Sequence, residues 1–299
     1  MPEITEIRKY ADFIRKQLKN EYIIDIKILN GRYKKHKPFK KYYSFKNNLP
    51  LKLLDVKTKG KFLYLIFDKN FYILSTLGLN GGWCYFSENK KKFLFSKNVS
   101  DYSENENNTY LKNSLKHLNI EFKTNKGSLY YFDILSFGTI KCINNDDELN
   151  IKLNKIGPDM MDESTNLELF MLQINKKINL DKYIGIVLMN QNIISGIGNY
   201  LRADILYLSK INPFRKVKNL NNNEIKTIFN NSKILIWSHY DIKEGIRLKI
   251  IKKSKISLYY KSFLIYNQDE DIYGNKVIKQ ELYEGSQKRF IYYVPNIQK

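Results

Sequence analysis

The 299-residue sequence has few residues that bind metals or form cross-links: two cysteines, Cys84 and Cys142, and three histidines, His36, His117 and His239. Neither cysteine belongs to a Cys-x-x-Cys pair, which excludes a four-cysteine zinc site and a disulfide framework. Because the histidines are equally scattered, we expect no metal site. The sequence also lacks the run of about 18 apolar residues that a membrane-spanning helix needs. It therefore predicts a protein that depends on neither metal, disulfide nor membrane.

Acidic residues are scarce relative to basic ones. The chain has 51 Lys and Arg against 30 Asp and Glu, which gives a formal net charge of +21. Its hydrophobic fraction of 43% is large enough to build a core, so a wholly disordered polycation is excluded. Basic residues scattered among Tyr and Phe favour nucleic acid over a membrane surface as the partner. A coding bias toward Lys, Asn, Ile and Tyr is the alternative explanation of the charge.

The N-terminal sequence, residues 1–6, does not resemble a signal peptide. It has no basic stretch followed by an apolar one, which is the pattern of a signal peptide. We therefore expect an intracellular protein, and no pattern in the sequence assigns it to the nucleus, the cytoplasm or a viral factory.

The spacing of apolar residues divides the chain into parts. Apolar residues at spacings of three and four predict a helix that opens right after Pro2: Ile4, Ile7, Ala11, Ile14 and Leu18. Strand periodicity from 22 to 86 and from 120 to 142 predicts a β-sandwich, with the polar residues 87–116 as a surface insertion. Helical patterns follow residue 145, and the tail returns to strand periodicity. The predicted fold class is α+β.

Pro2 is the first candidate for chemistry. Removal of Met1 would expose a secondary α-amine, a group whose pKa is ordinarily about 7.7 to 8.0. Such an amine can attack a carbonyl-like carbon and form an iminium cation that acts as an electron sink. Glu3 beside it can donate or accept a proton. The alternative is an ordinary helix start, since proline and glutamate are both common there.

The segment from Ser195 to Asn199 is the second candidate. Gly196 and Gly198 flank Ile197 and would let the backbone approach a bulky group. Asn199 stands where a helix N-cap is expected, and backbone N–H groups with an Asn amide at a helix N-terminus can bind phosphate. The alternative is a helix-turn-helix corner that is only capped by asparagine.

Residues 189–215 resemble the helix-two-turn-helix of the formamidopyrimidine-DNA glycosylase / endonuclease VIII family of base-excision-repair enzymes. Other segments resemble motifs of that family in the same order: Pro2-Glu3 with Glu6, and residues 56–62, 76–81, 133–138 and 153–159. The tail from Asn275 to Gln298 resembles the zincless finger of the viral and vertebrate Nei-like branch, whose hairpin keeps an arginine and has no metal.

The resemblance implies an architecture and an activity. Residues 1–150 would form the catalytic domain of a helix and a β-sandwich, 151–255 the helix-two-turn-helix domain, and 256–299 a zincless β-hairpin finger. DNA would lie between the domains. The implied activity is that of a bifunctional DNA glycosylase and apurinic/apyrimidinic (AP) lyase, active on double-stranded DNA with oxidised bases or abasic sites. We expect oxidised pyrimidines as the substrate class, no cofactor and a monomer.

The resemblance also implies roles for individual residues. Pro2 would attack C1′ of the damaged nucleotide, and Glu3 would assist ring opening and proton transfer. The remaining assignments are phosphate contacts for Lys61, Asn199 and Arg289, other DNA contacts for Gly196, Gly198, Leu79, Leu135 and Phe137, and supporting positions for Glu6 and Asp204. Two alternatives remain open, namely a damaged-DNA-binding protein without catalysis and an enzyme with AP lyase activity alone.

The sequence departs from the family at several positions. Leu135 and Ser136 stand where the family usually has two arginines, one of which fills the void left by the flipped base. Leucine can act as a wedge but cannot hydrogen-bond a base edge, so we predict weak dependence on the opposite base. Thr5, Asn190 and Asp204 replace the family's usual Pro, Asp and Glu, which we expect to preserve the local structure.

Overall fold

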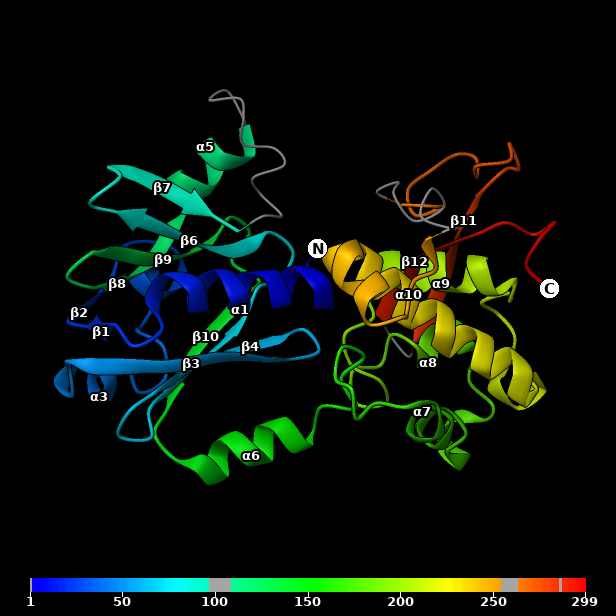
Figure 1. The fold of residues 1–299 in the computed structure, drawn as a ribbon, viewed down its shortest axis with the longest axis horizontal. Helices are drawn as coiled ribbons and strands as arrows, with labels where there is room; N and C mark the ends of the chain where they lie inside the picture. The colour runs from blue at the N-terminus through cyan, green and yellow to red at the C-terminus, as the bar shows by residue number, and fades with distance from the viewer. Residues whose placement is uncertain (1, 97–108, 254–262, 285–286) are drawn as a thin grey trace. The chain divides into compact units, whose positions relative to one another are not determined.

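The computed structural model describes residues 2–96, 109–253, 263–284 and 287–299. The chain divides into two compact units, the first made of Pro2 with residues 6–154 and the second of residues 3–5 and 155–299. The first unit is rich in strands and the second in helices (Figure 1). The α+β fold class predicted from the sequence is therefore confirmed.

The first unit contains two five-stranded sheets with antiparallel pairing, as the predicted β-sandwich requires. The order in the first sheet is β1 (Tyr22–Ile23), β3 (Leu51–Lys59), β4 (Phe62–Phe67), β5 (Tyr72–Thr76) and β10 (Thr139–Ile143). The order in the second is β2 (Asp25–Ile28), β8 (Leu118–Lys123), β9 (Gly127–Asp133), β6 (Gly81–Ser87) and β7 (Lys92–Phe95).

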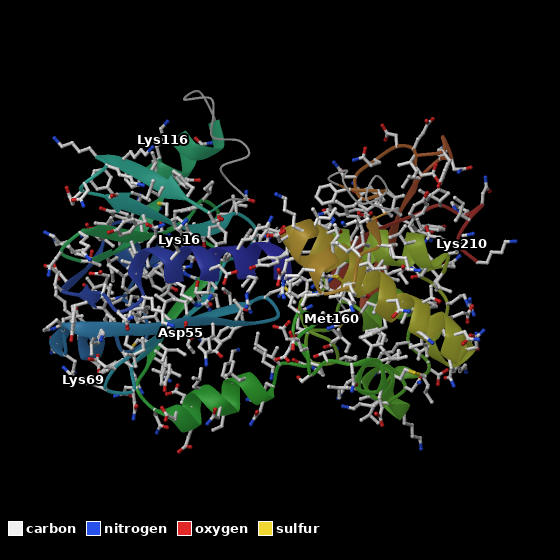
Figure 2. The ribbon with its side chains drawn as sticks, viewed as in Figure 1. Lys16, Asp55, Lys69, Lys116, Met160 and Lys210 are labelled. Carbon is white, nitrogen blue, oxygen red and sulfur yellow. The ribbon has the colours of Figure 1, made fainter. Side chains whose placement is uncertain are left out.

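Helix α1 (Ile4–Leu18) runs between the two sheets (Figure 1). Its apolar stripe from Ile7 to Leu18 is buried in the same core as residues of both sheets, which confirms the helix predicted from their spacing. Arg15 at the last turn donates through Nε to Asp55 of β3, at 2.8 Å. Figure 2 labels Asp55 on the sheet that contains β3. Trp83 is also part of this core and is fully buried.

The predicted surface insertion at 87–116 is partly wrong. It contains strand β7 and helix α5 (Thr109–Lys116), while the polar stretch 103–108 lies outside the described residues. Phe93 explains the strand, because its ring packs against those of Phe86 and Tyr130 across the sheet. Two further helices of this unit were not predicted, α2 (Arg32–Lys35) and α3 (Tyr42–Asn47), whereas α6 (Asp146–Asn154) begins where the helical patterns were expected, after residue 145.

The second unit holds the predicted helices and tail hairpin. Its helices are α7 (Leu167–Ile174), α8 (Ile184–Val187), α9 (Asn199–Ser209) and α10 (Asn222–Arg247), with short 3-10 turns η1 (Lys177–Asn179) and η2 (Val217–Asn219). Its hairpin pairs β11 (Ile278–Glu284) with β12 (Gln287–Tyr293). A strand predicted at 258–260 falls outside the described residues.

Membrane-spanning helices and metal clusters are both absent from the described residues. No helix in the described ranges is long and apolar enough to cross a membrane. The same ranges contain no group of three or more His, Cys, Asp or Glu side chains placed to hold a metal ion. Cys84 and Cys142 are both buried and free.

Candidate functional site

The Glu3 side chain is buried at the N-terminus of α9. Its Oε2 accepts hydrogen bonds from the backbone N–H of Gly198 at 2.7 Å and Leu201 at 3.3 Å, and its Oε1 accepts one from Tyr200 at 3.0 Å. Only 1% of Glu3 is exposed. The first N–H groups of a helix have no partner within the helix, and its dipole is positive at this end. The site therefore stabilises a negative charge on Glu3 away from solvent.

This arrangement corrects the predicted phosphate seat. The N-cap of α9 is Gly198 and not Asn199, which is the first helical residue. The N–H groups of Gly198, Tyr200 and Leu201 are bonded to Glu3, so these three do not form the open anion site that the sequence suggested. The sequence showed which donors would be there but not that a carboxylate almost 200 residues away would reach them.

The turn before α9 is shaped by Gly196. Its φ is +108°, and a Cβ at this position would lie 2.4 Å from Cδ1 of Ile4. The Ile4 N–H donates to the Gly196 carbonyl at 3.2 Å, and the Gly196 N–H donates to Oε1 of Gln191 at 2.9 Å. The bulky group predicted to approach these glycines is thus an isoleucine of the same chain, which fixes the backbone next to Glu3.

Replacing Gly196 with alanine should lower the free energy of unfolding by about 3 kcal/mol, from backbone strain together with the contact with Ile4. The matched control is Gly274→Ala, because Gly274 also has a positive φ, +80°, but nothing lies within 4 Å of its Cβ position. The control should lose only about 1 kcal/mol. Urea unfolding measures both, and equal losses would show that the approach to Ile4 is unimportant.

Arg202 is a residue whose role the sequence analysis missed. Its side chain is buried, with Nη1 donating to the carbonyl of Gly185 at 3.1 Å and Nη2 to Oδ1 of Asn199 at 3.3 Å and to the carbonyl of Phe290 at 2.8 Å. Burial lowers the pKa of Arg202 to about 10, so the guanidinium stays charged at neutral pH. The sequence did contain one signal of this role, because Arg202 is a charged residue within the apolar pattern of a predicted helix.

Arg202 connects two of the predicted phosphate contacts. It orients the Asn199 amide by donating to its oxygen, so the amide nitrogen points to the other side. It also holds β12 at Phe290, the neighbour of the half-buried Arg289. In this way one buried cation couples the start of α9 to the strand that carries Arg289.

Asp204 supports the same helix from a buried position. Its Oδ1 accepts N–H bonds from Ile265 and Tyr266 at 3.0 and 3.2 Å, and its Oδ2 accepts one from Leu264 at 3.0 Å. Burial raises the pKa of Asp204 to about 6, against the opposing effect of these bonds. Asp204 therefore attaches the segment that leads into the C-terminal hairpin to α9.

Three predicted site residues lie in the first unit or at its start. Pro2 is half-buried and directly precedes Glu3 in the chain. Lys61 lies in the turn between β3 and β4, beside Gly60 with φ of +55°, and is partly exposed. Glu6 lies in the first turn of α1 and is half-buried.

The three apolar residues predicted to contact DNA lie on two loops of the first unit and are exposed: Leu79 by 39%, Leu135 by 44% and Phe137 by 63%. The loops touch, since a Cβ on Gly78 would lie 2.6 Å from the backbone nitrogen of Gly138. The structure thus brings these three residues onto neighbouring loops.

Asp133, which is buried, shapes the second of these loops. It accepts the N–H groups of Ser136 at 2.9 Å and Gly138 at 2.7 Å. Ser136 has a φ of +59°, so these bonds hold a tight turn. Asp133 thereby presents the flanking Leu135 and Phe137 to solvent.

Comparisons with known proteins match both parts of the chain. Residues 1–140 match the family model of the formamidopyrimidine-DNA glycosylase N-terminal domain, and residues 156–248 match that of the formamidopyrimidine-DNA glycosylase H2TH domain. Proteins named formamidopyrimidine-DNA glycosylase from Mycoplasma mobile and Mycoplasma pneumoniae are each 25% identical to this chain. The first match covers 78% of this chain and 75% of the relative, the second 81% and 79%.

Solved structures show the same fold. Lactococcus lactis formamidopyrimidine-DNA glycosylase, bound non-covalently to DNA containing an AP site, aligns over 100% of both chains with a TM-score of 0.74 and 19% identity. The wild-type L. lactis protein in complex with DNA containing an oxidised pyrimidine aligns over the same extent, with a TM-score of 0.73 and 19% identity.

Proposed function

The chain belongs to the formamidopyrimidine-DNA glycosylase family, and on that basis we propose that it is a bifunctional DNA glycosylase and AP lyase that removes oxidised bases from double-stranded DNA. The observation that carries this proposal is the Glu3 carboxylate, which three backbone N–H groups of the α9 terminus hold directly after Pro2. A buried carboxylate beside a candidate nucleophile is the arrangement that acid–base assistance requires.

In the proposed reaction the nitrogen of Pro2, freed by removal of Met1, forms a bond to C1′ of the damaged nucleotide. The bond from C1′ to the base breaks, and the base leaves with a proton. Opening of the sugar ring, with a proton delivered to the ring oxygen, gives an iminium cation. Loss of a C2′ proton then expels the 3′-phosphate, so the strand is cut by β-elimination. Loss of the 5′-phosphate by a second elimination would follow.

Glu3 suits two steps of this reaction. Its negative charge stabilises the iminium cation, because opposite charges attract strongly where water is excluded. The carboxylate can also accept a proton and return it to the opening sugar ring. The N–H groups around Glu3 fix its position, so no reorganisation is needed as the cation forms.

Three polar side chains are proposed to hold the phosphates next to the flipped nucleotide. Lys61 and Arg289 would supply positive charge, and Asn199 would donate from its amide nitrogen. The bond from Arg202 to the Asn199 oxygen supports that orientation. A damaged base must leave the helical stack to be reached, and such contacts hold the extruded backbone in place.

We propose oxidised pyrimidines as the preferred lesions. The support is the tail, whose residues 275–298 contain no cysteine and resemble the zincless finger of Nei-like proteins. L. lactis structures of the same fold hold either an oxidised pyrimidine or a Fapy-dG in their DNA. Cleavage rates on duplexes that differ only in carrying a pyrimidine or a purine lesion test the preference, and faster cleavage of the purine lesion would contradict it.

Borohydride trapping tests the proposed activity. A covalent protein–DNA adduct should form on duplexes with an oxidised base and on abasic duplexes, but not on undamaged DNA. An adduct on abasic DNA alone would indicate a lyase without glycosylase activity. Binding to damaged DNA without any adduct would indicate a non-catalytic binding protein. Pro2→Gly replaces the secondary amine and provides the control for the nucleophile.

The cleavage rate should depend only weakly on the base opposite the lesion. Leu135 and the neighbouring Leu79 and Phe137 offer apolar surface to the space left by a flipped base and no hydrogen-bonding group. Rates for one lesion opposite each of the four bases should agree within about fivefold, since apolar contacts discriminate by only about 1 kcal/mol. Leu135→Arg should increase the spread. A spread above a hundredfold in the unaltered protein would contradict this assignment.

A further inference from the structure

One face of the C-terminal hairpin combines aromatic rings with lysines. Residues directly opposite each other in a sheet point to the same side. The β11–β12 register pairs Lys279 with Tyr292, Glu281 with Phe290, and Tyr283 with Lys288. These six residues therefore share one face, here called the aromatic face, whereas Arg289 belongs to the other face.

The side chains of the hairpin differ in burial. Leu282 is 4% exposed and Ile291 is fully buried, both on the face of Arg289. On the aromatic face Phe290 is 41% exposed and Tyr283 is 57% exposed. Packing within the protein also covers Tyr292 of the aromatic face, which is 8% exposed, but it leaves the rings of Phe290 and Tyr283 in contact with water. Two exposed rings on one face of a hairpin are typical of a binding surface.

Cations flank the exposed phenylalanine. Nζ of Lys279 lies 4.7 Å from the centre of the Phe290 ring, and Nζ of Lys288 lies 5.3 Å from it. Glu281 forms an ion pair with Lys288. The six residues of the face therefore include two cations and one carboxylate, so the face is positively charged overall.

We propose that the aromatic face binds the unpaired nucleotides of a single-stranded nucleic acid. Bases would stack on Phe290 and Tyr283, and Lys279 would contact the phosphates. Exposed rings beside cations are the combination that single-strand binding uses, because every base has a flat face and every nucleotide a phosphate. Paired bases in a duplex already stack on their neighbours and cannot cover these rings. This site is on the opposite face from Arg289 and is independent of the cleavage reaction.

Fluorescence anisotropy with a labelled 12-nucleotide oligothymidylate tests the proposal. Phe290→Leu keeps an apolar residue in the strand but removes the flat ring, and it should weaken binding about tenfold. Tyr283→Ser should weaken it by a similar factor. Tyr43→Ser is the matched control, since Tyr43 is 65% exposed in the other unit, and it should leave binding unchanged. Unchanged binding by both hairpin variants would overturn the proposal.

Two further measurements separate stacking from charge and locate the contact. Inorganic polyphosphate with the same number of phosphates should compete at least tenfold less well than unlabelled oligothymidylate, and equal competition would overturn stacking. An oligonucleotide with 5-iodouracil should cross-link to Tyr283 or Phe290 on irradiation, and cross-links confined to the first unit would overturn the location. Parallel oligothymidylate and oligouridylate arms identify whether DNA or RNA is the tighter ligand. None of these measurements requires the reaction of Pro2 with DNA. Their results therefore test the binding site independently of the proposed enzymatic activity.

Discussion

Changing Glu3 to glutamine should slow base release from a lesion duplex at least about a hundredfold, the lower range for loss of a general acid–base group. The substitution keeps the shape of the side chain but removes its charge. It also places an NH2 group against the N–H donors of α9, where only an acceptor fits. Both stabilisation of the iminium cation and proton transfer should therefore suffer.

Single-turnover measurement of base release, with enzyme in excess, isolates this effect from product release. Glu168→Gln is the matched control, because Glu168 also lies in the first turn of a helix, α7, but is exposed. The control should retain the full rate. A loss smaller than tenfold in Glu3→Gln would show that Glu3 has only a structural role at the end of α9.

Replacing Arg202 with methionine should strongly destabilise the protein. Methionine has a similar length but leaves the carbonyls of Gly185 and Phe290 and the Asn199 oxygen without their donor. Loss of one partner from a buried polar network of this kind costs about 3 kcal/mol. DNA affinity should fall as well, because the Asn199 amide and the strand of Arg289 lose their shared attachment.

Urea unfolding and binding to an abasic duplex test this prediction. Arg247→Met removes the same charge from a side chain that is 68% exposed, and it should change the free energy of unfolding by less than about 0.5 kcal/mol. An equal effect of the two substitutions would contradict the role assigned to Arg202.

Local periodicity in the sequence predicted the elements whose packing is regular. The spacing from Ile4 to Leu18 predicted α1, and the strand periodicity found between 22 and 86 covers β4, whose residues 62–67 are all apolar. Periodicity failed where a strand of only four residues lies within a polar segment, as β7 does, and this strand is held by Phe93, which packs on rings from other strands. Helices of four to six residues, such as α2 and α3, are too short to show a period.

The residues of the site were identified by motif, but their contacts could not be. Glu3 reaches Gly198, and Ile4 packs on Gly196, across more than 190 residues of sequence. Such contacts depend on the folded chain and leave no local pattern. For the same reason the sequence did not show that the α9 terminus holds a carboxylate, or that Arg202 joins that helix to β12.

The most direct test of the account is the position of the covalent bond to DNA. The protein is trapped with borohydride on a lesion duplex, digested, and the DNA-bearing peptide is sequenced by mass spectrometry. The account predicts that Met1 is absent and that the adduct is on the nitrogen of Pro2. An adduct on a lysine such as Lys61, or on a protein that retains Met1, would contradict it.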